Sequence, residues 1–176
     1  MAISVGVAVG DIADKLVEKL AERAKSLKIN DGTEGNPDMG PLVTKQHLDK
    51  VTGEVDKGTE EGPTLVVDGR GHKVKGHGNG FFIGRCLFDN VKPDMTIYKE
   101  EIFGPVLCVI PYENEEEAVR LANASDFGLF GAVLTNDNSK AYQIARSIRT
   151  GAYAQNGFRL DYFLPFGGFK KSGMGR

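Results

Sequence analysis

Residues 98–110 read YKEEIFGPVLCVI, and they carry the clearest signal of the fold class. Its second half, residues 106–110, is an unbroken apolar run, which is typical of a strand buried on both faces of a parallel sheet. Its first half places two adjacent carboxylates, an aromatic ring and a Gly-Pro turn at the mouth of that strand. Parallel neighbours require long crossover connections, usually helices, so the rest of the chain should alternate strands with helices.

The chain on both sides of this stretch does alternate these two patterns. Residues 1–9 alternate β-branched with small residues and predict a strand, and residues 12–27 carry apolar side chains at helical spacing. Thr44 can cap a second helix, which Gly58 is expected to end. The remaining expected elements are strands at Thr64–Val67, 81–88, 131–134 and 151–154, and helices that begin after Asn114 and at Asn138 or Ser139. We therefore predict an α/β fold, a three-layer αβα arrangement around a mostly parallel sheet.

Composition excludes several classes of function. The 22 basic and 24 acidic residues are mixed along the chain and leave a formal net charge of −2, so no basic field favours nucleic acid as a partner. The longest apolar run, near residues 3–9, is far short of the ~20 residues that span a bilayer, and no basic leader precedes it, so we expect no membrane association and a cytoplasmic protein. The three histidines lack metal-ligand spacing, so we expect no metal site.

The two cysteines, Cys86 and Cys108, both lie in apolar, strand-like stretches. Their spacing matches neither a disulfide framework nor a metal motif. A nucleophilic thiol needs partial exposure and an electropositive setting. We therefore predict two buried, structural cysteines that carry no chemistry.

Two segments have a composition that suits ligand binding. In residues 98–106, a carboxylate can accept both hydroxyl protons of a ribose, and a phenyl ring can bound one side of a nicotinamide. In residues 164–176, glycines permit close backbone approach and phenylalanines can wall a narrow pocket. On composition alone, a solvated acidic turn and a flexible tail are the competing interpretations of these segments.

Three motifs together resemble one family. KEEIFGPV at residues 99–106, PFGGFKKSGMGR at residues 165–176 and GPLV at residues 40–43 resemble signature segments of the aldehyde dehydrogenase superfamily, and the resemblance runs over residues 1–176 in family order. It implies an NAD(P)-dependent aldehyde dehydrogenase, with residues 1–176 as its catalytic domain truncated at both ends. In that family a cysteine thiolate adds to the aldehyde, NAD or NADP takes the hydride, and activated water releases the carboxylic acid.

The resemblance assigns roles to particular residues. Glu101 looks like the glutamate that binds the nicotinamide ribose, and Phe103 like the aromatic residue beside the nicotinamide. His47 and Lys50 fall near positions that can edge the cofactor. The residues that look like the lining of the tunnel for the aldehyde substrate are Phe166, Phe158 and Arg159.

Other parts of the family's machinery fall outside the match. The family's nucleophilic cysteine is expected immediately before Met1, so no catalytic residue is assigned and the fragment is expected to be inactive alone. The cofactor-binding Rossmann half is expected upstream, and the strand that joins subunits in a homo-oligomer is expected beyond Arg176. What these 176 residues retain is part of a cofactor site and part of a tunnel.

Two alternatives remain open. VVDGRG at residues 66–71 and NVKPDMTIYKEEIFGPV at residues 90–106 are similar to the methylmalonate-semialdehyde branch, which forms an acyl-CoA, whereas the glycine-rich end resembles the hydrolytic branches. Arg159 can pair with an acidic aldehyde such as a semialdehyde, or can be an ordinary solvated charge. The alternative from another class is a non-catalytic domain that binds a nucleotide or a partner subunit.

Overall fold

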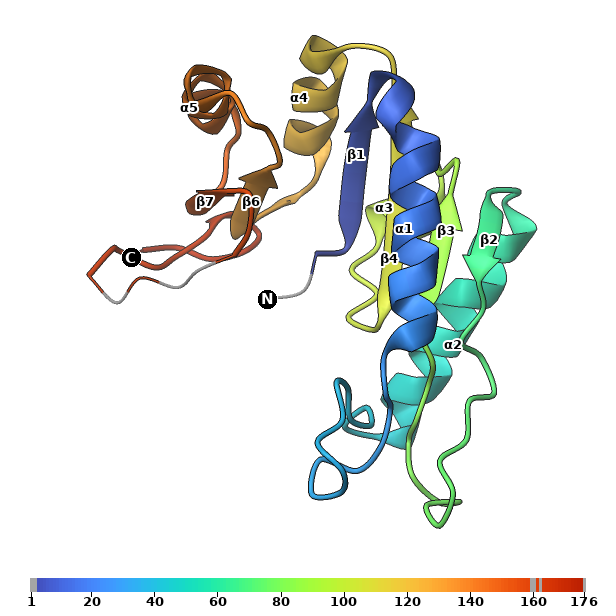
Figure 1. Ribbon diagram of the computed structural model, residues 1–176. Helices are drawn as coiled ribbons and strands as arrows, with labels where there is room; N and C mark the ends of the chain where they lie inside the picture. The colour runs from blue at the N-terminus through green and yellow to red at the C-terminus, as the bar shows by residue number, and fades with distance from the viewer. Residues whose placement is uncertain (1–2, 159–160, 162, 176) are drawn as a thin grey trace. The chain divides into compact units, whose positions relative to one another are not determined.

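The computed structural model describes residues 3–158, 161 and 163–175. The chain divides into two compact units, residues 2–113 and residues 114–176, called here the first and the second unit. Figure 1 labels most of their helices and strands. The first unit contains the larger sheet and carries the four residues expected at the cofactor.

The first unit is built on a four-stranded sheet with the order β1-β4-β3-β2. Its central strand β4 pairs in parallel with β1 and with β3, and β2 is antiparallel to β3 at one edge. The strands are β1 (Val5–Val9), β2 (Thr64–Val67), β3 (Cys86–Asp89) and β4 (Val106–Tyr112). The apolar run at residues 106–110 is therefore a central strand with a parallel neighbour on each side, as its sequence predicts.

Helices cover both faces of this sheet. After the 3-10 turn η1 (Gly10–Ile12), helix α1 (Ala13–Ser26) packs its apolar stripe on a cluster that includes Ala8, Leu87 and Val109. Helices α2 (Lys45–Glu60) and α3 (Thr96–Lys99) lie on the other face. This arrangement (Figure 1) confirms the predicted three-layer α/β architecture.

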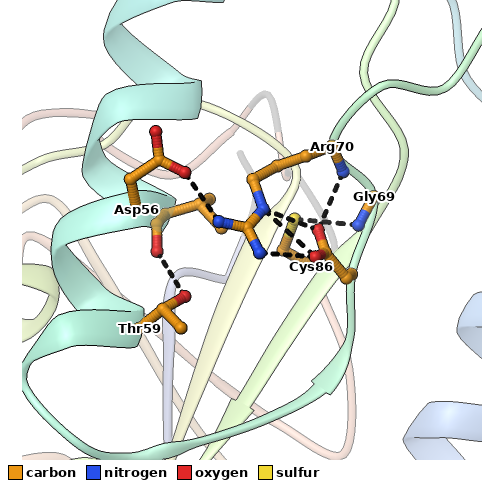
Figure 2. Close-up of polar contacts among 7 residues, drawn as sticks. Asp56, Thr59, Gly69, Arg70 and Cys86 are labelled. Carbon is orange, nitrogen blue, oxygen red and sulfur yellow. Dashed lines mark hydrogen bonds and ion pairs between the residues drawn. The ribbon is translucent and has the colours of Figure 1, made fainter.

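A polar cluster ties the chain after β2 to α2 (Figure 2). The Arg70 guanidinium bonds the carboxylate of Asp68 and, 2.6 Å away, that of Asp56 on α2, and its bonds lower the pKa of Asp68. The backbone N–H of Gly69 donates to the Cys86 sulfur at 3.3 Å. A Cβ on Gly69 would lie 2.1 Å from the carbonyl carbon of Gly84, so the two segments of the chain can cross here only because Gly69 has no side chain.

The second unit pairs two helices with two small sheets. Strand β6 (Phe130–Val133) runs parallel to β7 (Ala152–Gln155), and β5 (Phe127–Gly128) runs antiparallel to β8 (Phe169–Lys170). The helices are α4 (Glu115–Ala124) and α5 (Asn138–Ser147). Asn114 caps α4 by accepting the N–H of Glu117 at 2.9 Å, as the sequence predicts.

The glycine-rich C-terminal segment is held in place within the second unit. The Lys170 ammonium donates to the carbonyl oxygens of Asn123 and Ser125, at 2.8 and 2.7 Å, where α4 ends. The Ser172 hydroxyl accepts the N–H of Gly128 at 2.9 Å. These bonds and the β5–β8 pairing exclude the flexible-tail interpretation for residues 169–172.

The structure contains three short elements that the sequence-based prediction did not include, α3, β5 and β8, and it changes the bounds of two expected elements. Helix α2 does not end at Gly58 but continues to Glu60. Gly58 is a site of close packing against Ile97 and Phe88, and the glycine with a left-handed conformation is Gly62 (φ +94°), just after the helix. The expected strand at residues 81–88 is paired only from Cys86 onward. Phe82 and Ile83 are buried, but they precede the crossing at Gly84 and join no sheet, so apolar composition overstated the strand.

The two glycines inside α2 give a matched test of this packing. A Cβ on Gly58 would lie 2.6 Å from Ile97 Cγ2 and 3.1 Å from Phe88 Cζ, whereas a Cβ on Gly53 meets nothing within 4 Å. We expect Gly58→Ala to lower the free energy of unfolding by roughly 1 kcal/mol, since overpacking exceeds the gain in helix propensity. Gly53→Ala should raise it by roughly 0.5–1 kcal/mol. Urea unfolding of both variants measures this, and equal effects of the two changes would contradict the packing argument.

Candidate functional site

The segment with the two expected cofactor residues, Glu101 and Phe103, connects α3 to β4 at the amino end of that strand. Open α/β sheets generally bind ligands at the carboxyl ends of their strands. This segment lies at the opposite edge of the sheet, at the amino end of β4. Strand β1 is parallel to β4, with Val5 level with Cys108. The start of β1 therefore lies at the same edge as the segment.

Two side chains from the first turns of α2 hold the segment by its backbone. The Lys50 ammonium donates to the carbonyl oxygen of Glu101 at 3.0 Å. His47 Nε2 lies 2.7 Å from the carbonyl oxygen of Phe103, and because a carbonyl only accepts, Nε2 carries the proton. Thr44 caps α2 as predicted by accepting the N–H of His47 at 3.1 Å. All four residues expected at the cofactor are thus brought together.

Packing against buried residues also holds this segment in place. Ile102 is buried, and a Cβ on Gly104 would lie 2.7 and 2.8 Å from the two methyl groups of Val51, which is itself fully buried on α2. Burial of Ile102 between two exposed residues leaves the side chains of Glu101 and Phe103 facing solvent. The segment is therefore a tightly bound backbone that presents a carboxylate and a ring.

Phe103 has an unusual backbone conformation for a bulky residue. Its φ of +61° lies in the left-handed region, which costs roughly 1–2 kcal/mol for a residue with a Cβ. The ring is 73% exposed, so burial does not offset this cost. The bond from His47 to the carbonyl of Phe103, and the edge-on approach of the two rings at 6.5 Å, stabilise the conformation. An exposed ring held at such a cost indicates a role outside the core.

The exposed groups fit the nicotinamide ribose end of a dinucleotide. The Glu101 carboxylate forms no hydrogen bond or ion pair with any residue that the structure describes, so both oxygens can accept ribose hydroxyls. The Phe103 ring, one residue beyond buried Ile102, can bound a planar heterocycle. Glu101, Phe103, His47 and Lys50 all belong to one compact unit, so this geometry lies within a single packed body.

The residues expected along an aldehyde tunnel belong to the second unit. Phe158 packs edge-on against Phe130 with ring centroids 4.8 Å apart and remains 42% exposed. Phe166 is 52% exposed and precedes Gly167, whose carbonyl oxygen occupies the space that a Cβ on Gly151 would need. Arg159 lies outside the described residues. The two exposed rings are compatible with pocket lining.

Both cysteines are buried, as predicted. Burial raises the pKa of Cys108 to about 12 and also raises that of Cys86, despite the hydrogen bond from Gly69. Neither thiol is in a setting that favours a nucleophile. Within the described ranges no cluster of His, Cys, Asp and Glu could hold a metal ion, and no described helix is long and apolar enough to cross a bilayer.

Sequence reasoning missed two supports of the site, Val51 and Glu61. The signal was present in the helical spacing, because residues 47, 51, 54 and 58 fall on one stripe of α2, and residue 61, just past the end of the helix, continues that spacing. What the sequence lacked was the partner of that stripe, the segment of residues 96–104 some fifty positions away. Only the tertiary fold supplies this pairing.

This fold and site define a class: a three-layer α/β domain that presents an exposed carboxylate and an exposed ring at the amino edge of its parallel strands. Comparison with known proteins specifies the family. The profile of the "Aldehyde dehydrogenase family" matches residues 1–176. The chain belongs to the aldehyde dehydrogenase family.

Several relatives are close in sequence and in structure. Malonate-semialdehyde dehydrogenase from Pseudomonas aeruginosa is 49% identical over 181 residues, covering 99% of this chain and 36% of the relative. The acylating mitochondrial methylmalonate-semialdehyde/malonate-semialdehyde dehydrogenase of Mus musculus is 42% identical, covering 89% of this chain and 29% of the relative. A methylmalonate-semialdehyde dehydrogenase from Sinorhizobium meliloti, crystallised with NAD, matches with a TM-score of 0.94 and 45% identity, covering 99% of this chain and 36% of that structure. The chain thus spans about a third of the length of these relatives.

Thiol reactivity tests the assignment of the cysteines. A pKa of about 12 for Cys108 lowers its thiolate fraction at about pH 8 roughly a thousandfold relative to an ordinary thiol. We expect neither Cys86 nor Cys108 to react with a disulfide reagent such as DTNB in native buffer on a timescale of minutes, and both to react at once in concentrated guanidinium chloride. Rapid labelling of one thiol in the folded chain, lost in Cys86→Ser or Cys108→Ser, would show that a cysteine is accessible for chemistry.

Proposed function

We propose that this chain forms one wall of the nicotinamide ribose site, and part of the aldehyde tunnel, of an NAD(P)-dependent aldehyde dehydrogenase that oxidises an aldehyde to a carboxylic acid. The observation that carries the proposal is the clamped segment that presents Glu101 and Phe103 to solvent. Family membership and relatives crystallised with NAD support it.

Each residue of the site has a defined task in this proposal. Glu101 accepts the ribose hydroxyls and orients the ring attached to that ribose, and Phe103 bounds one face of the site and excludes water from it. Lys50 and His47 hold the backbone on which these two side chains stand, and both remain close enough to edge the cofactor. The bound dinucleotide, NAD or NADP, supplies the hydride acceptor.

The direction of the strands supports a common active edge. The family resemblance places the nucleophilic cysteine upstream of the first strand, and Val5, where β1 begins, is level with Cys108, the third residue of β4. A thiol attached there would lie at the same edge of the sheet as Glu101 and Phe103. The family's nucleophile and its cofactor wall are thus predicted to share one edge, which a domain with a purely structural role would not require.

A binding measurement on this chain tests the cofactor wall. We expect nicotinamide mononucleotide to shift the backbone NMR signals of residues 101–104 in the 15N-labelled protein, with a dissociation constant in the millimolar range because only one wall of the site is present. Glu101→Gln should weaken this binding by roughly tenfold, the equivalent of a charged hydrogen bond. Glu100→Gln, a change in the exposed neighbouring carboxylate, is the matched control and should have no effect.

Two results would contradict the cofactor wall. One is a set of shifts that AMP reproduces as well as nicotinamide mononucleotide. The other is an equal effect of the two glutamate changes.

A second candidate reaction is acyl-CoA formation from a semialdehyde. The names of the Pseudomonas aeruginosa and Mus musculus relatives favour it, because both act on malonate semialdehyde and the second is acylating. In this version Phe158 and Phe166 line the tunnel, and Arg159 pairs with the carboxylate of the substrate. Assembly of the whole enzyme as a homo-oligomer, and its location in the cytoplasm, stay predictions from the sequence.

Kinetics of an enzyme that contains this chain decide between these candidates. We propose a chimera in which residues 1–176 replace their counterpart in the Pseudomonas aeruginosa relative. Arg159→Ala should lower kcat/KM for malonate semialdehyde by roughly tenfold or more, because one buried carboxylate loses its partner, and should leave kcat/KM for propanal unchanged. Arg149→Ala is the matched control. An equal loss for both aldehydes would contradict the acidic pocket, and acyl-CoA release in the presence of coenzyme A would favour the acylating reaction.

A further inference from the structure

Glu61, the first residue after α2, caps helix α3, which leads directly into the segment that carries Glu101 and Phe103. Its carboxylate accepts the backbone N–H of Thr96 at 2.7 and 2.9 Å and also accepts the Thr96 hydroxyl proton. Thr96 is the first residue of α3, and the residue before it, Met95, provides no side-chain cap. Glu61 therefore fills a capping role from 35 positions away in sequence.

Helix α3 depends on such a partner. It has four residues, and a single turn is not stable on its own because its nucleation is unfavourable. A carboxylate bound to the first N–H groups of a helix forms a charge-assisted hydrogen bond and interacts favourably with the helix dipole. The other contacts of this turn include the burial of Ile97 against Gly58 of α2 and a weak hydrogen bond from the Cys108 thiol to the Ile97 carbonyl oxygen, at 3.6 Å, so we expect removal of the carboxylate to loosen the turn.

The position of α3 is passed on directly to the site. The N–H of Glu100 bonds the carbonyl oxygen of Thr96 at 2.8 Å, and Glu101 follows at once, with no glycine between Thr96 and Ile102 to absorb a rotation. At the other end of the segment, His47 and Lys50 hold the carbonyl oxygens of Phe103 and Glu101. Residues 96–103 are thus bonded at one end by Glu61, just after α2, and at the other end by His47 and Lys50 of α2.

We propose that Glu61 is a positioning residue for the Glu101 carboxylate and the Phe103 ring, acting through the cap of α3 and without contact with the cofactor. This role rests on the proposed cofactor wall. It predicts that a carboxylate outside the site controls both the order of residues 100–103 and their affinity for a nicotinamide nucleotide.

The test compares three variants of the 15N-labelled chain. Glu61→Ala removes the cap, Glu61→Gln keeps one neutral acceptor, and Glu60→Ala removes the adjacent exposed carboxylate, which forms no bond with any described residue. In Glu61→Ala we expect lower 1H–15N heteronuclear NOE values from Thr96 through Phe103 and roughly fivefold weaker binding of nicotinamide mononucleotide. Glu61→Gln should recover part of both effects, and Glu60→Ala should match the parent chain.

Three outcomes would overturn the positioning role. The first is disorder confined to residues 96–99, which would make Glu61 a local cap only. The second is weaker binding in Glu61→Ala without a change in the NOE values, which would indicate a direct charge effect on the ligand. The third is an equal effect of Glu60→Ala. If the parent chain does not bind the mononucleotide at all, the proposed cofactor wall fails, and the NOE values of residues 100–103 still decide whether Glu61 positions them.

Discussion

Two glycines, which have no side chain, allow helix α2 to pack directly against residues 96–104 at the amino edge of the sheet. Gly58 brings the helix into contact with Ile97, and Gly104 brings the segment onto Val51. At this distance His47 and Lys50, in the first turns of the helix, can reach the backbone carbonyls of Phe103 and Glu101. The close approach is thus the condition for every polar contact at the candidate site.

This contact explains how an exposed site can also be an ordered one. Loops that carry functional groups are usually less stable than the elements they connect, because few contacts oppose their motion. Here Ile102 anchors the segment in the core while Phe103 adopts a left-handed conformation that is unfavourable for its side chain. The hydrogen bond from His47 stabilises that conformation at the carbonyl of the strained residue itself. Binding groups fixed in this way lose little conformational entropy when a ligand arrives.

Much of the fold was predictable because local patterns carry it. The apolar run at residues 106–110, the caps at Thr44 and Asn114, and the burial of both cysteines follow from residue type and spacing. The errors occurred where tertiary contacts override local preference: Gly58 is read as a helix end from sequence but is a packing contact in the structure. The four residues expected at the cofactor were named by family resemblance, and their proximity could not be derived from spacing, since α2 and the segment are some fifty positions apart in sequence and come together only in the tertiary fold.

In the second unit, residue types that often bind ligands stabilise the fold instead. Two lysines, one serine and several glycines in its C-terminal segment are residue types of an anion-binding loop, yet the Lys170 ammonium donates to two carbonyls at the end of α4 and the Ser172 hydroxyl accepts a backbone N–H of β5. With these polar groups committed to the fold, the segment has mainly its exposed rings to offer a ligand, as at Phe166. In the proposed function, the exposed Glu101 carboxylate of the first unit serves a ribose, and exposed rings of the second unit, such as Phe166, serve the carbon chain of an aldehyde.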